Sequence, residues 1–419
     1  MKQQSRSTLW HAYSALGGEP LKVTHSQGIR LTLNDGRELL DGTMGWWAML
    51  HGYSHPYIEQ KMHDQLATIP HVPMFSELVH EPAERLADRL THIAPGNMQA
   101  VFFSESGSSA VEVAMKMALQ YWRSSGKPQK NHFATLRNGF HGDTFGSMSL
   151  CGSEHSLFSE YQGIVKPAFQ LDPPPLGISR PFQKEDLAST EQLLEKHHHE
   201  IAALFVEPLV QGYAGLKMYS PEYLKALHDL CKSFDILFVA DEVAAGFVKT
   251  GSMFACDQAQ ISPDLMCLAK SLTGGMMSMG ATLASSLVLE VLGDQPFMHG
   301  ATYMATALGC AAGNANLDLL ETGQWQADVA RIAHKLKTGL AECSDIPGVT
   351  LCQSMGLLAA VSVEQEIDTA RFRQYSISQG ATIRCIGKTA YLAIPINTTS
   401  EDIEFLTHCF KDCLKTVAI

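Results

Sequence analysis

The sequence predicts an α/β protein whose larger domain is built on a mostly parallel sheet. Short apolar runs alternate with helical stretches through the middle of the 419-residue chain. The apolar runs carry no polar residue at alternate positions, which is typical of strands buried on both faces. The C-terminal third has a different pattern, with helices followed by short strand candidates, and it indicates a smaller α+β domain.

Four strands are expected in the middle of the chain, and helical patterns lie between them. The clearest helical patterns cover residues 109–123 and 221–233. Strands that alternate with helices in this way pair in parallel, so the order predicts a parallel sheet. The expected strands are 100–103, 202–206, 236–240 and 265–268.

The C-terminal third begins with helical patterns at 305–320 and 326–340. Strand candidates follow at 350–353 and 357–363, and a further helix and a strand pair are expected to close the chain. We therefore expect a large domain over 46–305 and a small domain over 306–419. The N-terminal segment 1–45 is expected to join the small domain or to cross to a second subunit.

Composition favours an ordinary soluble protein with small-molecule partners. The chain is 45% apolar and 18% charged, and its formal net charge of −12 disfavours a nucleic-acid surface. No apolar run is long enough to cross a membrane, and the first residues lack the apolar stretch of a signal peptide. Ten cysteines without a CxxC pair indicate reduced thiols and a cytoplasmic location. The run His197–His199 is better explained as a solvated helix end than as a metal site, and we expect no metal.

Two charged residues directly follow apolar strands, where the ligands of open parallel sheets bind. Asp241 follows the run 236–240, and Lys270 follows the run 265–269. Either residue alone could be a helix cap or half of an ion pair. Together they suit an aldehyde cofactor with a pyridine ring. A desolvated lysine can form an imine with the aldehyde, and an aspartate can keep the ring nitrogen protonated.

The segment 104–109, Ser-Glu-Ser-Gly-Ser-Ser, suits a phosphate group. It follows a strand candidate and opens a helix, whose backbone N–H groups and dipole favour an anion. Ser109 and Glu112 have the spacing of a capping box. The segment matches neither a Walker loop nor the GxGxxG pattern, which disfavours a nicotinamide dehydrogenase.

The polar loop 138–144 follows another strand candidate and contains Phe140. An aromatic face at this position could stack on a flat cofactor. Taken without its context, a glycine-rich turn with a phenylalanine in the core is an equally good interpretation.

Several of these motifs occur together, in one order that runs through most of the chain. They are Ser106-Gly107-Ser108, Phe140-His141-Gly142-Asp143, Glu207-Pro208, Asp241-Glu242-Val243 and Lys270. In this order and spacing the chain resembles the class III, or ω-type, aminotransferases. The resemblance implies a fold type I architecture, pyridoxal 5'-phosphate as the cofactor, and a homodimer.

A narrower resemblance, over roughly residues 8 to 415, is to the class III members of biotin synthesis. Its most distinctive feature is the tandem tryptophan Trp46-Trp47, and it also rests on the segments 51–56, 114–122, 141–146, 253–256, 299–302 and 383–392. It implies amino transfer from S-adenosyl-L-methionine to 8-amino-7-oxononanoate, which gives 7,8-diaminononanoate. The alternative is a related ω-aminotransferase whose donor is lysine, a diamine or an ω-amino acid.

The resemblance implies a role for each matching position. Lys270 would hold the cofactor covalently and carry the proton, and Asp241 would pair with the ring nitrogen. Gly107 and Ser108 would bind the phosphate, while Ala301 and Thr302 would reach the cofactor of a second subunit. Arg384 would bind a substrate carboxylate, for which a planar bidentate donor is suited. The substrate pocket would be lined by Tyr13, Trp46, Trp47, Phe140 and Gly300.

Four places depart from the pattern of these enzymes. Phe140 stands where they carry tyrosine, so stacking is kept but a hydroxyl is lost, and Ala12 stands where they carry proline. The stretch 246–251 lacks the Gly-Arg usual before Thr-Gly, and 303–308 lacks the usual Gly-Asn-Pro. A different class of function, a cofactor-binding regulator or scaffold without turnover, is disfavoured because Lys270 and Asp241 are both present.

Overall fold

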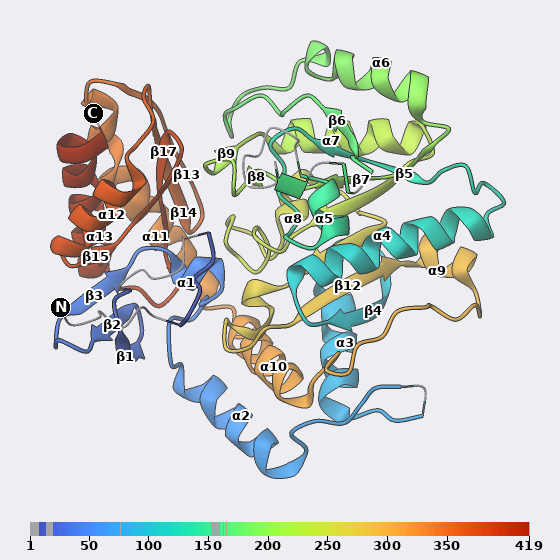
Figure 1. Cartoon of the computed structure of the whole chain (residues 1–419), viewed down its shortest axis with the longest axis horizontal. Coiled ribbons are helices and arrows are strands. Elements are labelled where there is room, and N and C mark those ends of the chain that lie inside the picture. The colour runs from blue at the N-terminus through green and yellow to red at the C-terminus, as the bar shows by residue number, and fades with distance from the viewer. Residues whose placement is uncertain are drawn as a thin grey trace.

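A seven-stranded sheet forms the centre of the larger part of the molecule (Figure 1). The computed structural model describes residues 8–13, 20–75, 77–151, 160–161, 163–164 and 166–418. Among the described strands of this sheet, β12 is antiparallel to its neighbours and the others run in one direction. The mostly parallel sheet is thus confirmed. Its strands are, in spatial order, β4 (Met98–Ser104), β12 (Gly280–Ser285), β11 (Leu265–Leu268), β10 (Leu237–Asp241), β7 (Ile201–Val206), β5 (His132–Leu136) and β6 (Phe169–Leu171).

The central strands are buried on both faces, as the unbroken apolar runs predicted. Every residue of β7 and β10 is buried. Leu204 and Phe238 contribute to the larger apolar core, whereas Phe205 and Val239 contribute to a second core. Successive side chains of a strand point to opposite faces, so one apolar run supplies both cores.

Helices cover both faces of the sheet (Figure 1). Helices α4 and α9 pack on the side of the second core, and α7 packs on the side of the larger core. Helix α10 packs against α2 and α3. The helices of this part are α2 (Pro56–Thr68), α3 (Glu81–Ile93), α4 (Gly107–Ser124), α5 (Phe145–Ser149), α6 (Ala188–His197), α7 (Pro221–Ser233), α8 (Ala255–Ala259), α9 (Ser286–Leu292) and α10 (Ala307–Glu321).

The start of α4 differs from the expectation. The helix begins at Gly107 because Ser106 is its N-cap, and the Ser106 Oγ accepts from the backbone N–H of Ser109 at 3.1 Å. The predicted capping box of Ser109 and Glu112 is therefore wrong. The Glu112 carboxylate instead accepts from the backbone N–H of Gly146, at 2.8 Å, and so fastens the loop before α5. By contrast, α7 has the bounds that were predicted for it.

A smaller part joins the two ends of the chain, drawn in blue and in orange to red in Figure 1. One four-stranded sheet has the order β13-β14-β17-β16, and another has the order β1-β2-β3-β15, in which Leu40 of β3 lies opposite Ala381 of β15. The prediction that a strand pair closes the chain is wrong, because residues after it form helix α13. The elements are β1 (Val23–Gln27), β2 (Arg30–Leu33), β3 (Glu38–Asp41), α1 (Met44–Trp47), α11 (Trp325–Gly339), β13 (Val349–Met355), β14 (Leu358–Val363), α12 (Thr369–Ser378), β15 (Ala381–Thr382), β16 (Arg384–Ile386), β17 (Thr389–Ala393) and α13 (Ser400–Cys413).

The limits proposed for the two domains stay predictions. Helix α10 lies beyond the expected limit at residue 305, yet its packing partners α2 and α3 precede the central sheet in the chain. Within the described ranges, no helix has the length and apolar character needed to cross a bilayer.

Candidate active site

A cavity of about 630 Å³ lies at the carboxyl end of the central sheet. The ends of β10 and β11, the start of α4 and the single turn α1 all contribute to its wall. Most of the residues proposed from the sequence line it, although they come from widely separated segments. These are Tyr13, Trp46, Trp47, Gly107, Ser108, Phe140, Asp241 and Lys270.

The register of the sheet places Asp241 and Lys270 side by side. Asp241 ends β10 and lies opposite Cys267 of the neighbouring β11, and a single residue separates Lys270 from the end of β11. Burial lowers the pKa of the Lys270 amine below its usual range, and the carboxylates of Asp241 and Glu207 partly oppose this shift. A lowered pKa favours the neutral amine, which is the nucleophilic form.

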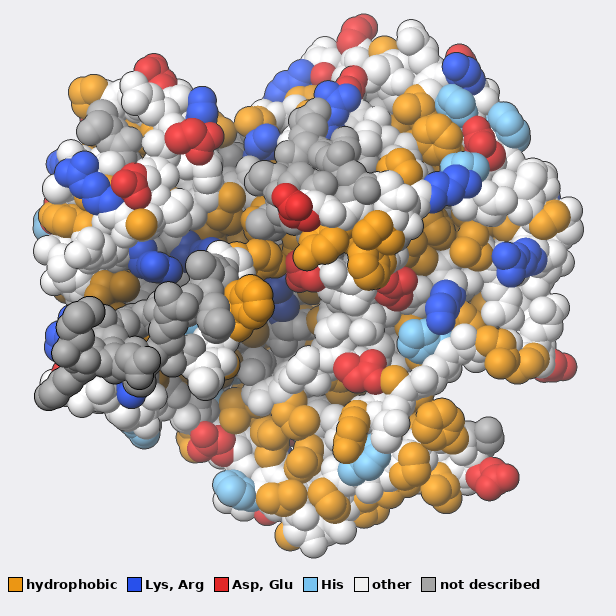
Figure 2. All heavy atoms as spheres, in the orientation of Figure 1, with side chains coloured by type: hydrophobic (Ala, Val, Ile, Leu, Met, Phe, Trp, Pro, Cys, Tyr) orange, Lys and Arg blue, Asp and Glu red, His pale blue; other side chains and the backbone are white. Residues whose placement is uncertain are grey.

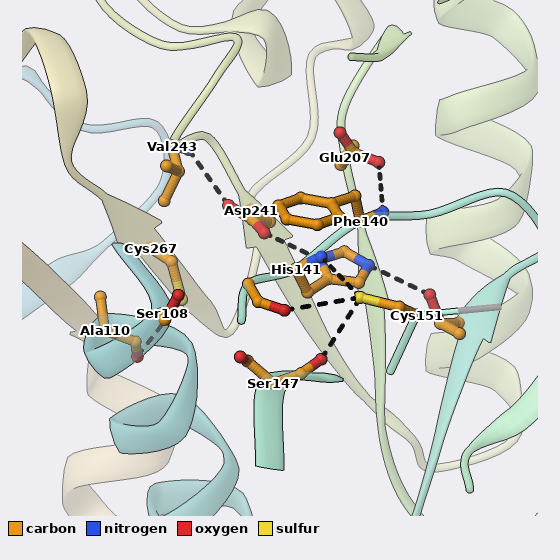
Figure 3. A network of polar contacts seen from close by, with 12 residues as sticks. Ser108, Ala110, Phe140, His141, Ser147, Cys151, Glu207, Asp241, Val243 and Cys267 are labelled. Carbon is orange, nitrogen blue, oxygen red and sulfur yellow. Dashed lines mark hydrogen bonds and ion pairs between the residues drawn. The ribbon is translucent and has the colours of Figure 1, made fainter. Parts of the chain in front are cut away.

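Asp241 is held in one orientation by a network of polar contacts (Figure 3). Its Oδ2 lies 2.7 Å from Nδ1 of the buried His141, and its Oδ1 accepts from the backbone N–H of Val243 at 3.1 Å. The His141 Nε2 lies 3.1 Å from the hydroxyl of Thr135. If Nδ1 donates to the carboxylate, Nε2 of a neutral ring is left to accept from Thr135. His141 thereby fixes the position of the Asp241 Oδ2.

Glu207 fixes two loops on another wall of the cavity. Its Oε2 accepts from the backbone N–H of Phe140 at 2.9 Å, and its Oε1 accepts from the N–H of Gly212 at 3.0 Å. The Phe140 ring stacks on Tyr213, with centroids 4.9 Å apart and an angle of 24° between the rings. Burial raises the pKa of the Glu207 carboxyl to about 7. The aromatic pair is thus held from both loops at once.

Contacts between Tyr13, Asp143 and Ser108 join the N-terminal segment to the start of α4. The Tyr13 hydroxyl donates to Asp143 Oδ1 at 2.9 Å, and the Asp143 backbone N–H donates to the Ser108 Oγ at 3.1 Å. Burial, reinforced by the Asp143 carboxylate, raises the pKa of Tyr13. At neutral pH the phenol is therefore a hydrogen-bond donor at the cavity wall.

The tandem tryptophan lies on a turn with left-handed backbone. The φ angles of Met44, Gly45, Trp46 and Trp47 are 54°, 53°, 60° and 71°. A left-handed conformation costs about 1–2 kcal/mol for each residue other than glycine, so such a turn needs support from its surroundings. The buried Asp41 provides part of it, because its Oδ2 accepts from the Gly45 N–H at 2.7 Å.

Arg384, Gly300, Ala301 and Thr302 do not line this cavity. Arg384 lies just beyond it, with its guanidinium carbon 3.6 Å from the centroid of the Trp46 ring. The other three residues lie on the surface segment between α9 and α10, where Gly300 and Thr302 are exposed. Their expected contacts therefore do not form within one chain.

Three residues of the site received no role from the sequence alone. In the sequence, His141 and Glu207 stand out only as parts of motifs, and no pattern singles out Tyr213. His141 and Glu207 act by orienting other groups, which a strand-end pattern cannot reveal. A histidine within the expected aromatic loop was the one available signal for the first of them.

The residues present fit pyridoxal phosphate. Lys270 offers an amine of lowered pKa, Asp241 offers an oriented carboxylate for a pyridinium nitrogen, and Phe140 offers an aromatic face. Gly107 and Ser108 are the first residues of an 18-residue helix, whose leading N–H groups have no partner within the helix. A Cβ on Gly107 would lie 2.8 Å from a methyl of Val243, so glycine is required there. When bound, this cofactor supplies a ring that accepts electrons from the substrate.

Comparisons with known proteins agree with this arrangement. Residues 13–414 match the family profile described as aminotransferase class-III. A Corynebacterium glutamicum protein named adenosylmethionine-8-amino-7-oxononanoate aminotransferase is 37% identical over 406 residues, which cover 96% of this chain and 95% of that protein. The crystal structure of a Methanocaldococcus jannaschii protein of the same name has a TM-score of 0.91 and 27% identity, and the match covers 98% of both chains.

A further match concerns the cofactor. An amine transaminase from an uncultivated Pseudomonas species, solved in a form with bound pyridoxal phosphate, has a TM-score of 0.89 and 28% identity. The match covers 98% of both chains. The cavity has the lysine, the carboxylate and the helix start that this cofactor needs, and the family match extends over nearly the whole sequence. The chain therefore belongs to the class III aminotransferases, which are enzymes that depend on pyridoxal phosphate.

Proposed function

We propose that this aminotransferase moves an amino group from S-adenosyl-L-methionine to 8-amino-7-oxononanoate, giving 7,8-diaminononanoate for biotin synthesis. The observation that carries the proposal is the Arg384–Trp46 pair at the edge of the cavity, a cation 3.6 Å from an aromatic face. The names of the relatives from Corynebacterium glutamicum and Methanocaldococcus jannaschii support the same substrates.

We assign the two substrate ends to different groups. Arg384 binds the carboxylate of the keto acid, because a guanidinium can form two parallel hydrogen bonds with it. Trp46, whose side chain is 49% exposed, covers the apolar chain between the carboxylate and the reacting carbonyl. Lys270 acts as acid and base in the 1,3-proton shift of the transamination. Asp241 keeps the ring nitrogen of the cofactor protonated.

Single-turnover spectroscopy tests the choice of donor. Enzyme loaded with pyridoxal phosphate is mixed with S-adenosyl-L-methionine, lysine, a diamine or an ω-amino acid, and the absorbance of the two cofactor forms is followed. We expect rapid conversion with S-adenosyl-L-methionine, and return of the original absorbance when 8-amino-7-oxononanoate is added. Conversion by lysine or a diamine alone would replace this proposal by the alternative of a broader ω-aminotransferase.

We also propose a homodimer in which Ala301 and Thr302 serve the cavity of the second subunit. Figure 2 shows hydrophobic side chains gathered over α2 and the segment after it. Phe75, Leu78 and Val79 there are 52–55% exposed, a cluster that association would bury. Gly300 would line the substrate pocket from the same surface segment.

Sedimentation and cofactor binding test the dimer separately from the substrates. We expect a dimer at micromolar concentration. We expect Thr302→Ala to weaken the binding of pyridoxal phosphate without dissociating the dimer. A fully active monomer, or an unchanged cofactor dissociation constant in the variant, would remove the shared site. For location we propose the cytoplasm, because all ten cysteines are free thiols.

A further inference from the structure

A second lysine, Lys249, is fully buried behind the cavity. Its Nζ donates to the hydroxyl oxygen of Ser271 at 2.9 Å. Among the described residues no carboxylate forms an ion pair with it, and the Phe247 ring centroid lies 6.0 Å from the amine. A buried amine without a counter-ion is costly to keep, so its single polar contact calls for an explanation.

The partner of Lys249 touches the tryptophan turn. The Ser271 Oγ lies 3.0 Å from the carbonyl oxygen of Trp47 and 3.1 Å from that of Ala48. A hydroxyl has one proton and can donate to these carbonyls only while its lone pairs stay available to a donor. The Lys249 amine supplies that donor. The direction of these hydrogen bonds is therefore fixed: the amine donates to the hydroxyl, and the hydroxyl donates to a backbone carbonyl.

Ser271 also directly follows Lys270, which has a left-handed φ of 47°. The backbone carbonyl of Ser271 accepts from the side-chain amide of Asn316 at 2.9 Å. One residue thus joins two strained segments, the turn that carries Trp46 and the bend that carries Lys270. Asp41 holds the beginning of the tryptophan turn, and Ser271 holds its end.

Burial lowers the pKa of Lys249 well below its usual range, the positive charge of Lys270 lowers it further, and the Glu242 carboxylate opposes both. A neutral amine still has two N–H donors. The contact with Ser271 therefore does not require a second positive charge beside Lys270.

We propose that Lys249 is a positioning residue that acts through Ser271 to hold the left-handed tryptophan turn against the segment of Lys270. It is not among the residues that line the cavity. It orders the wall that presents Trp46 to the amino acceptor.

Hydrogen exchange of the peptide that covers residues 44–50 tests the proposal directly, on the holoenzyme. In Lys249→Met, which keeps an unbranched side chain one atom shorter and removes the donor, we expect exchange to become at least tenfold faster. Ser271→Ala should give the same increase. The double variant should show no further change, because both residues belong to the same series of hydrogen bonds. This readout does not depend on which substrates the enzyme uses.

Lys130→Met is the matched control. Lys130 is also a buried lysine, and its Nζ donates to the backbone carbonyls of His198 and Ile201, outside the cavity. We expect it to lower the melting temperature while exchange in 44–50 stays at the wild-type rate. Should Lys249→Met fail to fold, Ser271→Ala carries the same expectation.

Steady-state kinetics with the amino acceptor that the enzyme uses gives a second readout. We expect Lys249→Met to raise the acceptor KM about tenfold while kcat stays within about threefold, since the chemistry at Lys270 is retained. Wild-type exchange in 44–50 for both Lys249→Met and Ser271→Ala would overturn the proposal. So would additive effects in the double variant, or an equal rise of the acceptor KM in Lys130→Met.

Discussion

The floor and the outer wall of the cavity are built in different ways. The floor consists of Asp241, Lys270 and the start of α4, which lie at or directly after the ends of the central strands β10, β11 and β4. The outer wall contains Trp46, against which Arg384 packs just beyond the cavity. These two residues come from opposite ends of the chain and meet where β3 pairs with β15. Sheet register positions the floor, whereas a left-handed turn and a strand pairing distant in sequence position the wall.

This difference separates chemistry from selectivity. We propose that the floor groups act on the cofactor, which every substrate uses, so their loss should affect all substrates alike. In the same proposal, Trp46 and Arg384 contact the parts of a substrate that do not react, so their loss should affect substrates unequally. Substitutions in the two regions test this division.

The largest effect is expected for Lys270→Ala. Among the described residues, Lys270 is the one lysine that lines the cavity. Its loss should abolish the borohydride-fixable adduct with the cofactor and lower turnover about a thousandfold or more, for every donor. Absorbance spectra and mass spectrometry after borohydride treatment measure the adduct. Lys130→Ala, a buried lysine outside the cavity, should keep the adduct. A Lys270→Ala enzyme with normal turnover would refute the assignment of the floor.

Asp241→Asn should lower both half-reactions about a hundredfold while some cofactor is retained. An amide cannot hold the ring nitrogen in its charged form, and the contact with His141 Nδ1 loses its ionic partner. Rapid-mixing absorbance measures each half-reaction. Equal losses for donor and acceptor are expected, since Asp241 belongs to the floor. A loss confined to one of them would break the division between floor and wall.

Arg384→Ala should act selectively. Losing a charge-assisted contact costs about 2–5 kcal/mol, which corresponds to a fall of about thirtyfold or more. We expect this fall in the half-reaction of 8-amino-7-oxononanoate and a smaller one with a donor that does not use the contact. Arg180→Ala is the control, since Arg180 pairs with Asp186 outside the cavity. If both half-reactions fall equally, or neither does, Arg384 is not the selective carboxylate ligand.

The last prediction concerns the stability of the fold. It involves Glu242, a buried residue that is not among those lining the cavity. Burial raises the pKa of Glu242 to about 7. The folded state therefore binds this proton more tightly than the unfolded state does, so the contribution to stability is greatest at low pH. It is lost as the pH rises from about 4.5, the unfolded value, through about 7. Glu242→Gln should remove this pH dependence, which is a change on the order of 3 kcal/mol in the free energy of unfolding between pH 5 and 8.

Urea unfolding at several pH values measures this change. Glu207 has a pKa raised in the same direction, so part of the slope should remain in the variant. Glu195→Gln, an exposed position on α6, should leave the slope unchanged. A Glu242→Gln protein whose stability falls with pH as steeply as the wild type would show that Glu242 does not carry the proton.

The sequence was most informative where local pattern and function coincide. The unbroken apolar runs of β10 and β11 identified strands buried on both faces, and the residues that follow them, Asp241 and Lys270, were recognisable at once. The start of α4 was less certain from the pattern, because several serines compete for the cap, and Ser106 rather than Ser109 provides it. Motif order then led to the family.

Tertiary structure alone decided how the side chains are oriented and joined. No local pattern predicts that His141 anchors Asp241, that Glu207 holds the loops of Phe140 and Tyr213, or that Lys249 reaches Ser271. These contacts join segments far apart in the chain, and their strength depends on burial that arises only after the sheets and helices have packed. A strand or a helix start follows from neighbouring residues, whereas the direction of a hydrogen bond between distant segments follows from the whole fold.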